Sequence, residues 1–252
     1  MTCPRRSPGP AWKTPGIGSG RALIKAGPFA LIGLAATPAE ACRLALVLAL
    51  DVSSSVDATE DRLQRSGLAA ALRAPEVEAA FFASPNPVAL QVFEWSGQRN
   101  QTDLMDWMLI RSPADLRLAA DRLAGSTRST RDMPTAMGYA LGYAAIKLQQ
   151  APDCLFKTID MAGDGANNDG FSPANAYAAF PFDGVTVNGL VIVAPDATPQ
   201  TYYETEVIRG PNAFVEVAEG FADFENAMRR KLLRELSAQV IGGIQGQTGD
   251  QG

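Results

Sequence analysis

The chain has 252 residues, of which 46% are hydrophobic and 19% are charged, a composition that excludes intrinsic disorder and suits one large folded domain. It contains no histidine, which excludes Ser-His-Asp catalysis and zinc sites with histidine ligands. Any metal site must therefore be built from oxygen ligands or from at most three cysteine sulfurs. Residues 42–252 carry 26 acidic and 17 basic side chains, a balance that argues against nucleic acid as a partner.

The first 41 residues have the features of an export signal, namely positive charge, an apolar run and a cleavage pattern. Arg21 and Lys25 precede the apolar stretch Pro28–Ala36, and Ala-Glu-Ala at 39–41 has the small-x-small pattern that signal peptidases cut after. We expect residues 1–41 to be a signal peptide and the mature protein to be periplasmic or extracellular. The alternatives are a disordered N-terminal tail and a lipid anchor on Cys42. No later segment is apolar over a length that could cross a membrane.

Strand and helix patterns alternate along the rest of the chain. The apolar run Leu44–Leu50 predicts a strand buried on both faces, and Asp57 with Glu60 resembles a capping box that opens a helix to Arg73. Further strands are predicted at Val88–Trp95, Leu155–Met161, Val185–Val193 and Ala213–Val217, with Asp103–Ile110 returning antiparallel beside Val88–Trp95. Further helices are predicted at Asp115–Ala124, Met137–Leu148 and Phe221–Leu236.

This alternation predicts the α/β class, with a doubly wound, mostly parallel sheet, helices on both faces and one antiparallel edge strand. We expect one domain over residues 42–240, followed by a disordered C-terminal tail at 241–252. In such sheets, ligands bind beyond the carboxyl ends of the strands, near the point where the strand order reverses. The residues at those strand ends are therefore the candidates for function.

Short oxygen-bearing side chains stand at these positions. Asp51, Ser53 and Ser55 follow the first strand, Asp164 follows the strand that begins near Leu155, and Thr135 precedes the helix at Met137–Leu148. Together they offer two carboxylates and three hydroxyls, with no nitrogen or sulfur. Such a set suits a hard divalent cation, Mg²⁺ first, with Mn²⁺ or Ca²⁺ as alternatives.

Several segments resemble known families. The run LALVLALDVSSSVD resembles the metal-ion-dependent adhesion site, D-x-S-x-S, of von Willebrand factor A domains, and Gly163-Asp164-Gly165 resembles their T-D-G strand end. The runs VFEWSG, IDMAGDGANNDG, GPNAFVEVA and RRKLLREL resemble a bacterial family, domain of unknown function 1194, whose members are predicted exported proteins with this fold. The resemblance covers residues 43–238.

The resemblance implies a set of cation ligands and a kind of partner. Ser53, Ser55 and Thr135 would bind the cation directly, and Asp51 and Asp164 would bind it directly or through water. One coordination position would stay open for an acidic side chain of a partner protein. Two departures from the family pattern concern single positions: Pro134 replaces a glycine, which leaves Thr127 as a rival to Thr135, and Gly163 replaces a threonine, which we expect to matter little.

Three functions are consistent with these residues. The first is an exported, non-enzymatic protein-binding module that depends on a divalent cation. The second is a Mg²⁺-dependent phosphohydrolase with Asp51 as nucleophile, although Ser53 stands where such enzymes usually carry a second aspartate as acid and base. The third is a degenerate A domain with a structural role only.

The resemblance also predicts a disulfide. In the A-domain topology the strands that begin near Cys42 and Cys154 are parallel neighbours, and both run toward the candidate aspartates. Cys42 lies nine residues before Asp51 and Cys154 lies ten before Asp164. With the aspartates level, the Cα separation of the cysteines is roughly 5.8 Å, which a disulfide can span. A pair of buried thiols is the alternative.

The remaining polar residues are expected to have ordinary roles. Glu94 is expected to be solvated and Trp95 to be packed at the end of their strand, with a part in shaping the binding surface as the alternative. Arg229, Arg230 and Lys231 are expected to form the solvated face of the last helix. Loop positions are expected for Asn167, Asn168 and Asp169, with contacts around the cation site as the alternative.

Overall fold

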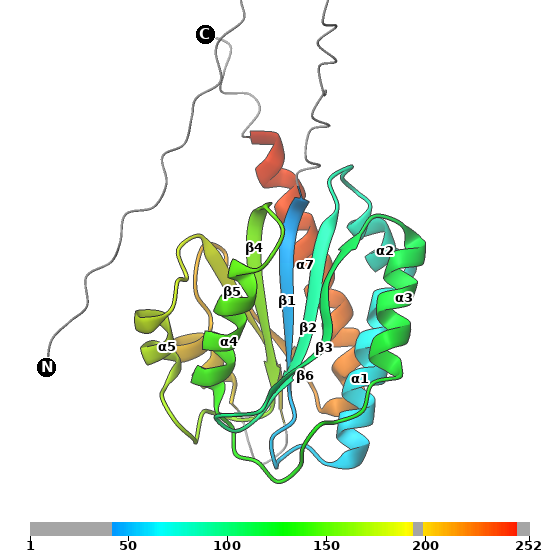
Figure 1. Ribbon diagram of the computed structural model, residues 1–252. Coiled ribbons are helices and arrows are strands. Elements are labelled where there is room, and N and C mark those ends of the chain that lie inside the picture. Colours follow the sequence, from blue (N-terminus) through cyan, green and yellow to red (C-terminus); the bar gives the residue numbers. More distant parts are fainter. Residues whose placement is uncertain (1–41, 194–198, 246–252) are drawn as a thin grey trace, which may run out of the picture. The chain divides into compact units, whose positions relative to one another are not determined.

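The computed structural model of the protein describes residues 42–193 and 199–245 (Figure 1). The expected signal peptide, residues 1–41, lies outside these residues. Six strands form one sheet in the order β3-β2-β1-β4-β5-β6. The strands are β1 Cys42–Asp51, β2 Val88–Trp95, β3 Gln101–Ile110, β4 Cys154–Gly163, β5 Val185–Ile192 and β6 Val215–Ala218.

Helices cover both faces of this sheet. They are α1 Ala58–Arg73, α2 Pro75–Phe81, α3 Pro113–Ala124, α4 Met137–Gln149, α5 Pro173–Ala179, α6 Gln200–Tyr202 and α7 Phe224–Gln245, with a π-helix at Tyr203–Val207 and a 3₁₀ turn at Phe221–Asp223. Leu44, Leu46 and Leu48 of β1 pack on one face with α1, α2, α3 and α7. Ala45 and Val47 face the opposite core, which α4, α5 and the π-helix complete. The alternate residues of β1 thus fill two cores, which is why its central run Leu44–Leu50 is apolar at every position.

The predicted fold class is confirmed. β1 pairs in parallel with β2 and β4, and β4, β5 and β6 continue in parallel, whereas β3 pairs antiparallel with β2 at the edge. The predicted capping box is also present, since the Asp57 carboxylate accepts a hydrogen bond from the N–H of Glu60 and the Glu60 carboxylate accepts one from the N–H of Asp57. No helix within 42–193 and 199–245 is long and apolar enough to cross a membrane.

Helix boundaries are where the structure departs most from the sequence pattern. The short helices α2 and α5 were not predicted; each opens with a proline, Pro75 or Pro173, whose fixed φ suits the first helical turn. The last helix begins at Phe224 and continues to Gln245. Residues 241–245, which we assigned to a disordered tail, therefore extend the helix, and no proline stands there to stop it.

A disulfide joins Cys42 and Cys154, as expected, at the end of the sheet opposite the candidate aspartates. The two cysteines are directly paired in the β1–β4 register, and their Cα atoms are 4.2 Å apart. This separation is shorter than the roughly 5.8 Å estimated from the sequence. That estimate placed a one-residue offset between the two cysteines, whereas the structure places it between the two aspartates. Leu50 pairs with Ala162, so Asp164 lies one residue beyond the level of Asp51.

Lys231 is not solvated, which corrects the expectation for the last helix. Its side chain is 0% exposed, and its Nζ lies 2.7 Å from Asp160 Oδ1 in β4 and 2.7 Å from Glu235 Oε1 one turn along α7. Asn188 of β5 donates a hydrogen bond to the same Glu235 oxygen at 2.6 Å. A buried cluster of ion pairs and hydrogen bonds therefore links α7 to strands β4 and β5. By contrast, the side chain of Arg230 is 50% exposed, as expected.

Candidate metal centre

The candidate site lies where β1 and β4 end side by side. The chain leaves β1 toward β2 on one side of the sheet and later returns to β4 on the other, so this is the point where the strand order reverses. Asp51 is the last residue of β1, and Asp164 directly follows β4. The topology therefore brings together two loops that are more than 100 residues apart in the sequence.

Four of the five predicted ligands form one hydrogen-bonded cluster. The hydroxyl of Ser55 donates to Asp164 Oδ1 at 2.8 Å, and the Oγ atoms of Ser53 and Ser55 are 3.2 Å apart. The N–H of Ser53 donates to Asp51 Oδ1 at 2.7 Å, which fixes the carboxylate against its own loop. Asp51 and Ser53 are buried and Ser55 is exposed, so the cluster runs from the core to the surface.

The fifth predicted ligand, Thr135, lies beside the loop that carries Asp164. Its Oγ1 is 3.8 Å from the point where a Cβ on Gly165 would lie, and its residue is 4% exposed. Its rival, Thr127, is exposed and lines a groove beside α1. The structure thus places Thr135 next to the Asp164 loop.

The loop after Asp164 holds Thr135 in place. Asn168 Oδ1 accepts a hydrogen bond from the N–H of Thr135 at 2.9 Å, while the N–H groups of Asn168 and Asp169 donate to the Thr135 carbonyl. Asn167 Oδ1 accepts from the N–H of Gly138 at 3.3 Å, in the first turn of α4. These loop residues therefore make contacts around the site, which was the alternative to a purely solvated role.

The electrostatics of the cluster fit a cation. Asp51 Oδ2 is buried and has no hydrogen-bond partner within the described part of the chain. Burial and, to a smaller extent, the nearby charge of Asp164 together raise the pKa of Asp51 to about 7. Burial also raises the pKa of Asp164. A divalent cation beside both carboxylates would stabilise their charged forms and so lower both pKa values. The all-oxygen donor set matches Mg²⁺ or Ca²⁺ chemistry.

The donor set differs from the commonest metal clusters. Among residues 42–193 and 199–245, no group of three or more His, Cys, Asp or Glu side chains is placed to hold a metal ion. The candidate site has two carboxylates, from Asp51 and Asp164, and completes its oxygen atoms with hydroxyls. A site of this kind binds through a mixture of charged and neutral ligands.

Gly163 matters more than we expected. A Cβ at this position would lie 2.7 Å from Tyr203 Oη and 2.9 Å from Asp51 Oδ2, closer than side chains tolerate. Tyr203 belongs to the π-helix, is fully buried, and packs in the same way against Gly189 of β5. The absence of a side chain at Gly163 therefore lets the phenol of Tyr203 reach the space behind Asp51.

Arg128, which the sequence analysis did not single out, holds the loop after β1. Its Nη1 donates to the carbonyl of Val56 at 2.6 Å, and its Nη2 donates to the carbonyls of Ser53, at 2.9 Å, and Val52. One guanidinium thus satisfies three carbonyls of the D-x-S-x-S loop, because its N–H groups form a rigid fork. No sequence pattern identifies an arginine that acts through backbone carbonyls of a distant loop.

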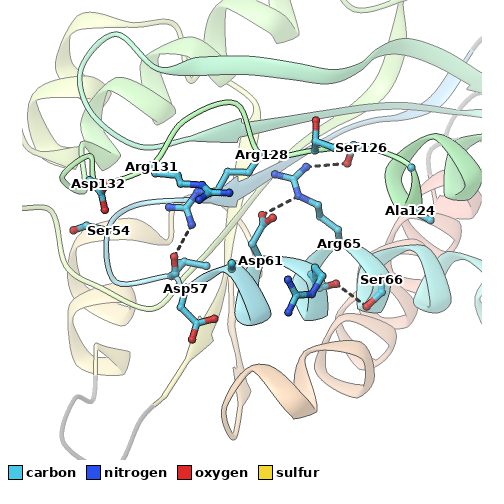
Figure 2. Close-up of a pocket in the computed structure, with 15 residues that line it drawn as sticks. Ser54, Asp57, Asp61, Arg65, Ser66, Ala124, Ser126, Arg128, Arg131 and Asp132 are labelled. Atoms are coloured by element: carbon cyan, nitrogen blue, oxygen red, sulfur yellow. Dashed lines mark hydrogen bonds and ion pairs between the residues drawn. The ribbon is translucent and has the colours of Figure 1, made fainter.

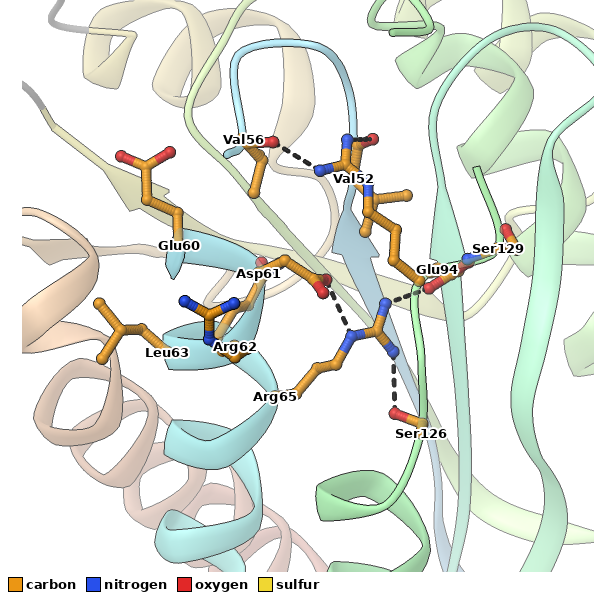
Figure 3. Close-up of polar contacts among 12 residues, drawn as sticks. Val52, Val56, Glu60, Asp61, Arg62, Leu63, Arg65, Glu94, Ser126 and Ser129 are labelled. Carbon is orange, nitrogen blue, oxygen red and sulfur yellow. Dashed lines mark hydrogen bonds and ion pairs between the residues drawn. The ribbon is translucent and has the colours of Figure 1, made fainter. Parts of the chain in front are cut away.

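Glu94 is buried and paired, which corrects the expectation that it is solvated (Figure 3). Its carboxylate forms an ion pair with Arg65 of α1, and its Oε1 accepts from the N–H of Ser129 at 2.6 Å. Arg65 also bonds Asp61 and Ser126, both at 2.8 Å. The network connects α1, β2 and the loop that carries Arg128. The signal available in the sequence was a charged residue inside the otherwise buried run VFEW.

Three solved structures show which known fold this is. The von Willebrand factor type A protein from Catenulispora acidiphila matches with a TM-score of 0.54 at 16% identity, over 78% of this chain and 43% of its own. Proximal thread matrix protein 1 from the mussel byssus, in a structure with a zinc-occupied MIDAS motif, matches with a TM-score of 0.54 at 16% identity, over 79% and 49%. The conserved hypothetical protein BatB from Bacteroides thetaiotaomicron matches with a TM-score of 0.51 at 17% identity, over 78% and 98%.

The fold is therefore that of von Willebrand factor A domains. At these identities the likeness establishes the fold alone, and the chain spans less than half the length of the first two proteins. A family model described as "Protein of unknown function (DUF1194)" matches residues 41–240, and the chain belongs to this family. No curated protein matches the chain.

Proposed function

We propose that the protein is an exported, non-catalytic binding module that uses a divalent cation to capture an acidic side chain of a partner protein. The observation that carries this proposal is the convergence of carboxylate and hydroxyl oxygens at the β1–β4 switch point, with a buried Asp51 oxygen that finds no hydrogen-bond partner among the described residues. The proposed ligands are Asp51, Ser53, Ser55, Thr135 and Asp164. We favour Mg²⁺, whose six oxygen ligands commonly include waters and so leave room for a partner's carboxylate.

The burial of Asp51 supports a binding role over the phosphohydrolase alternative. A nucleophilic carboxylate must reach the phosphorus atom of its substrate. Here Asp51 is 0% exposed, its Oδ1 accepts a hydrogen bond from the N–H of Ser53, and its Oδ2 is buried beside Gly163. A screen of the Mg²⁺-loaded protein against generic phosphate esters is therefore expected to give no turnover, and turnover that depends on Asp51 would favour the hydrolase.

The disulfide supports export. Disulfides persist in oxidising compartments and are rare in reducing ones. The Cys42–Cys154 bond lies at the far end of the sheet from the candidate cation site, a position that suits a structural role. Together with the signal-like sequence of residues 1–41, this bond supports a periplasmic or extracellular location.

The cation requirement is tested by comparing partner capture in Mg²⁺ and in EDTA. The immobilised protein is incubated with periplasmic extract, and the Asp164→Ala variant provides the matched control. We expect at least one protein to be retained in Mg²⁺, released by EDTA and absent from the variant, since both treatments remove the bridge to the partner's carboxylate. A specific partner that the wild type retains equally in both buffers would contradict the cation bridge.

A further inference from the structure

A groove of about 920 Å³ runs from the candidate metal loop along α1 (Figure 2). Ser54 and Asp57 lie at one end of it, and Ser66 and Ala124 lie at the other. The rise of α1 from Ala58 to Ser66 is about 12 Å, so the groove has room for about three or four residues of extended peptide. Its end at Ser54 belongs to the loop that carries Ser53 and Ser55. The groove therefore shares this loop with the candidate cation site, although none of the five proposed ligands lines it.

Arginines are concentrated in this groove. Four of its fifteen lining residues are arginines, in a body where acidic side chains outnumber basic ones by nine: Arg62, Arg65, Arg128 and Arg131. Three acidic residues also line it: Asp57, Asp61 and Asp132. Asp57 is committed to capping α1, and Asp61 is committed to Arg65. Two of the three carboxylates are therefore already occupied within the protein.

Two of the arginines are free to bind a ligand. Within the part of the chain that the structure describes, Arg62, Arg128 and Arg131 form no ion pair with a carboxylate. The guanidinium of Arg128 donates its hydrogen bonds to backbone carbonyls. Arg62 and Arg131 are exposed, and the guanidinium of Arg62 makes one hydrogen bond, to Thr59 at 2.9 Å. A free guanidinium binds a carboxylate through two parallel hydrogen bonds.

The floor of the groove is rigid. Arg65 is 4% exposed and is held by Asp61, Ser126 and Glu94 (Figure 3). Arg128 ties the wall of the groove to the metal loop through the carbonyls described above. Hydrogen bonds thus connect the floor and wall of the groove to the loop of the candidate cation site.

We propose that this groove binds an acidic peptide segment of the partner, whose carboxylates pair with Arg62 and Arg131. The carboxylate that the proposed function places at the cation site would belong to the same partner. The inference therefore deepens that function, but the contacts with Arg62 and Arg131 do not require the cation. Bulk attraction does not explain such binding, because residues 42–252 are acidic overall.

The test measures binding of fluorescein-labelled hexaglutamate by fluorescence anisotropy in low salt. The double variant Arg62→Gln/Arg131→Gln is compared with the wild type and with Arg117→Gln, a control on α3 whose side chain is 59% exposed and outside the groove. We expect the double variant to bind about three- to ten-fold more weakly, the scale of two partly exposed ion pairs. The control should bind like the wild type. Equal binding by the double variant, or no measurable binding by the wild type, would overturn the proposal.

Two further arms separate the possible explanations. A sulfated oligosaccharide that binds as tightly as hexaglutamate, and is weakened by the same double variant, would show a general polyanion site and overturn the assignment to a peptide. The hexaglutamate measurement is also repeated in EDTA. If the groove is correct and the cation site is not, the double variant still weakens binding and Mg²⁺ has no effect. If only the cation site is correct, Mg²⁺ strengthens binding equally in all three proteins.

Discussion

Replacing Lys231 by methionine is expected to lower the free energy of unfolding by roughly 3–5 kcal/mol, the cost of leaving buried charges without their partner. The Lys231 ammonium lies between Asp160 and Glu235, and all three side chains are at most 1% exposed. Methionine has a similar length but cannot donate a hydrogen bond, so two carboxylates would stay buried without a cation. Urea unfolding of the variant and the wild type measures the effect.

The neighbouring arginine provides the matched control for this prediction. Arg230 is on the same helix as Lys231, and Arg230→Met removes its ion pair with Glu216 of β6. The Arg230 side chain is 50% exposed, so we expect a loss within about 1 kcal/mol. Adding Asp160→Asn to Lys231→Met should recover part of the lost stability, because it removes one of the uncompensated charges. A Lys231→Met variant as stable as Arg230→Met would show that the cluster does not stabilise α7 on the sheet.

Replacing both Cys42 and Cys154 by alanine is expected to lower the free energy of unfolding by about 4–5 kcal/mol in the chain-entropy model. The bond closes a loop with a sequence separation of 112, and removing it frees the unfolded chain. Alanine at both positions avoids burying a hydroxyl at Cys42, which is 1% exposed. The comparison uses urea unfolding of the oxidised wild type and the variant.

Reduction offers an independent check on the same bond. With a strong reductant present, the wild type should unfold at nearly the urea midpoint of the double-alanine variant, since both then lack the cross-link. The variant itself should not respond to the reductant. Equal midpoints for the oxidised wild type and the variant would contradict a stabilising disulfide.

The fold was predictable because its strands carry strong local signals. The run Leu44–Leu50 is apolar at every position, which is typical of a strand buried on both faces, and the structure confirms such a strand inside the sheet. The positions of Asp51 and Asp164 at strand ends followed from the same pattern. Parallel topology then placed both aspartates on one edge, so most of the candidate site could be assembled before any distances were known.

The misassigned residues are charged groups whose partners are distant in the sequence. Glu94 and Lys231 were expected in solvent because a lone charge usually lies there. Each is buried because a partner on another element, Arg65 or Asp160, reaches it. Arg128 was overlooked for a related reason, since its acceptors are backbone carbonyls and no residue type marks them. The cysteines are level with each other and the aspartates are offset by one residue, and this could be determined only from the register of β1 and β4.

Calorimetric titration of Mg²⁺ and Mn²⁺ into the wild type and the Asp51→Ala variant tests the central claim most directly. We expect the wild type to bind one cation and Asp51→Ala to bind none while keeping its fold, because the change removes a buried carboxylate that the site needs to hold the ion. Ser53→Ala should weaken binding by about 1–3 kcal/mol, the scale of a lost polar contact to a charge. A wild type that binds neither cation, or an Asp51→Ala variant that binds as tightly as the wild type, would contradict a cation site at the ends of β1 and β4.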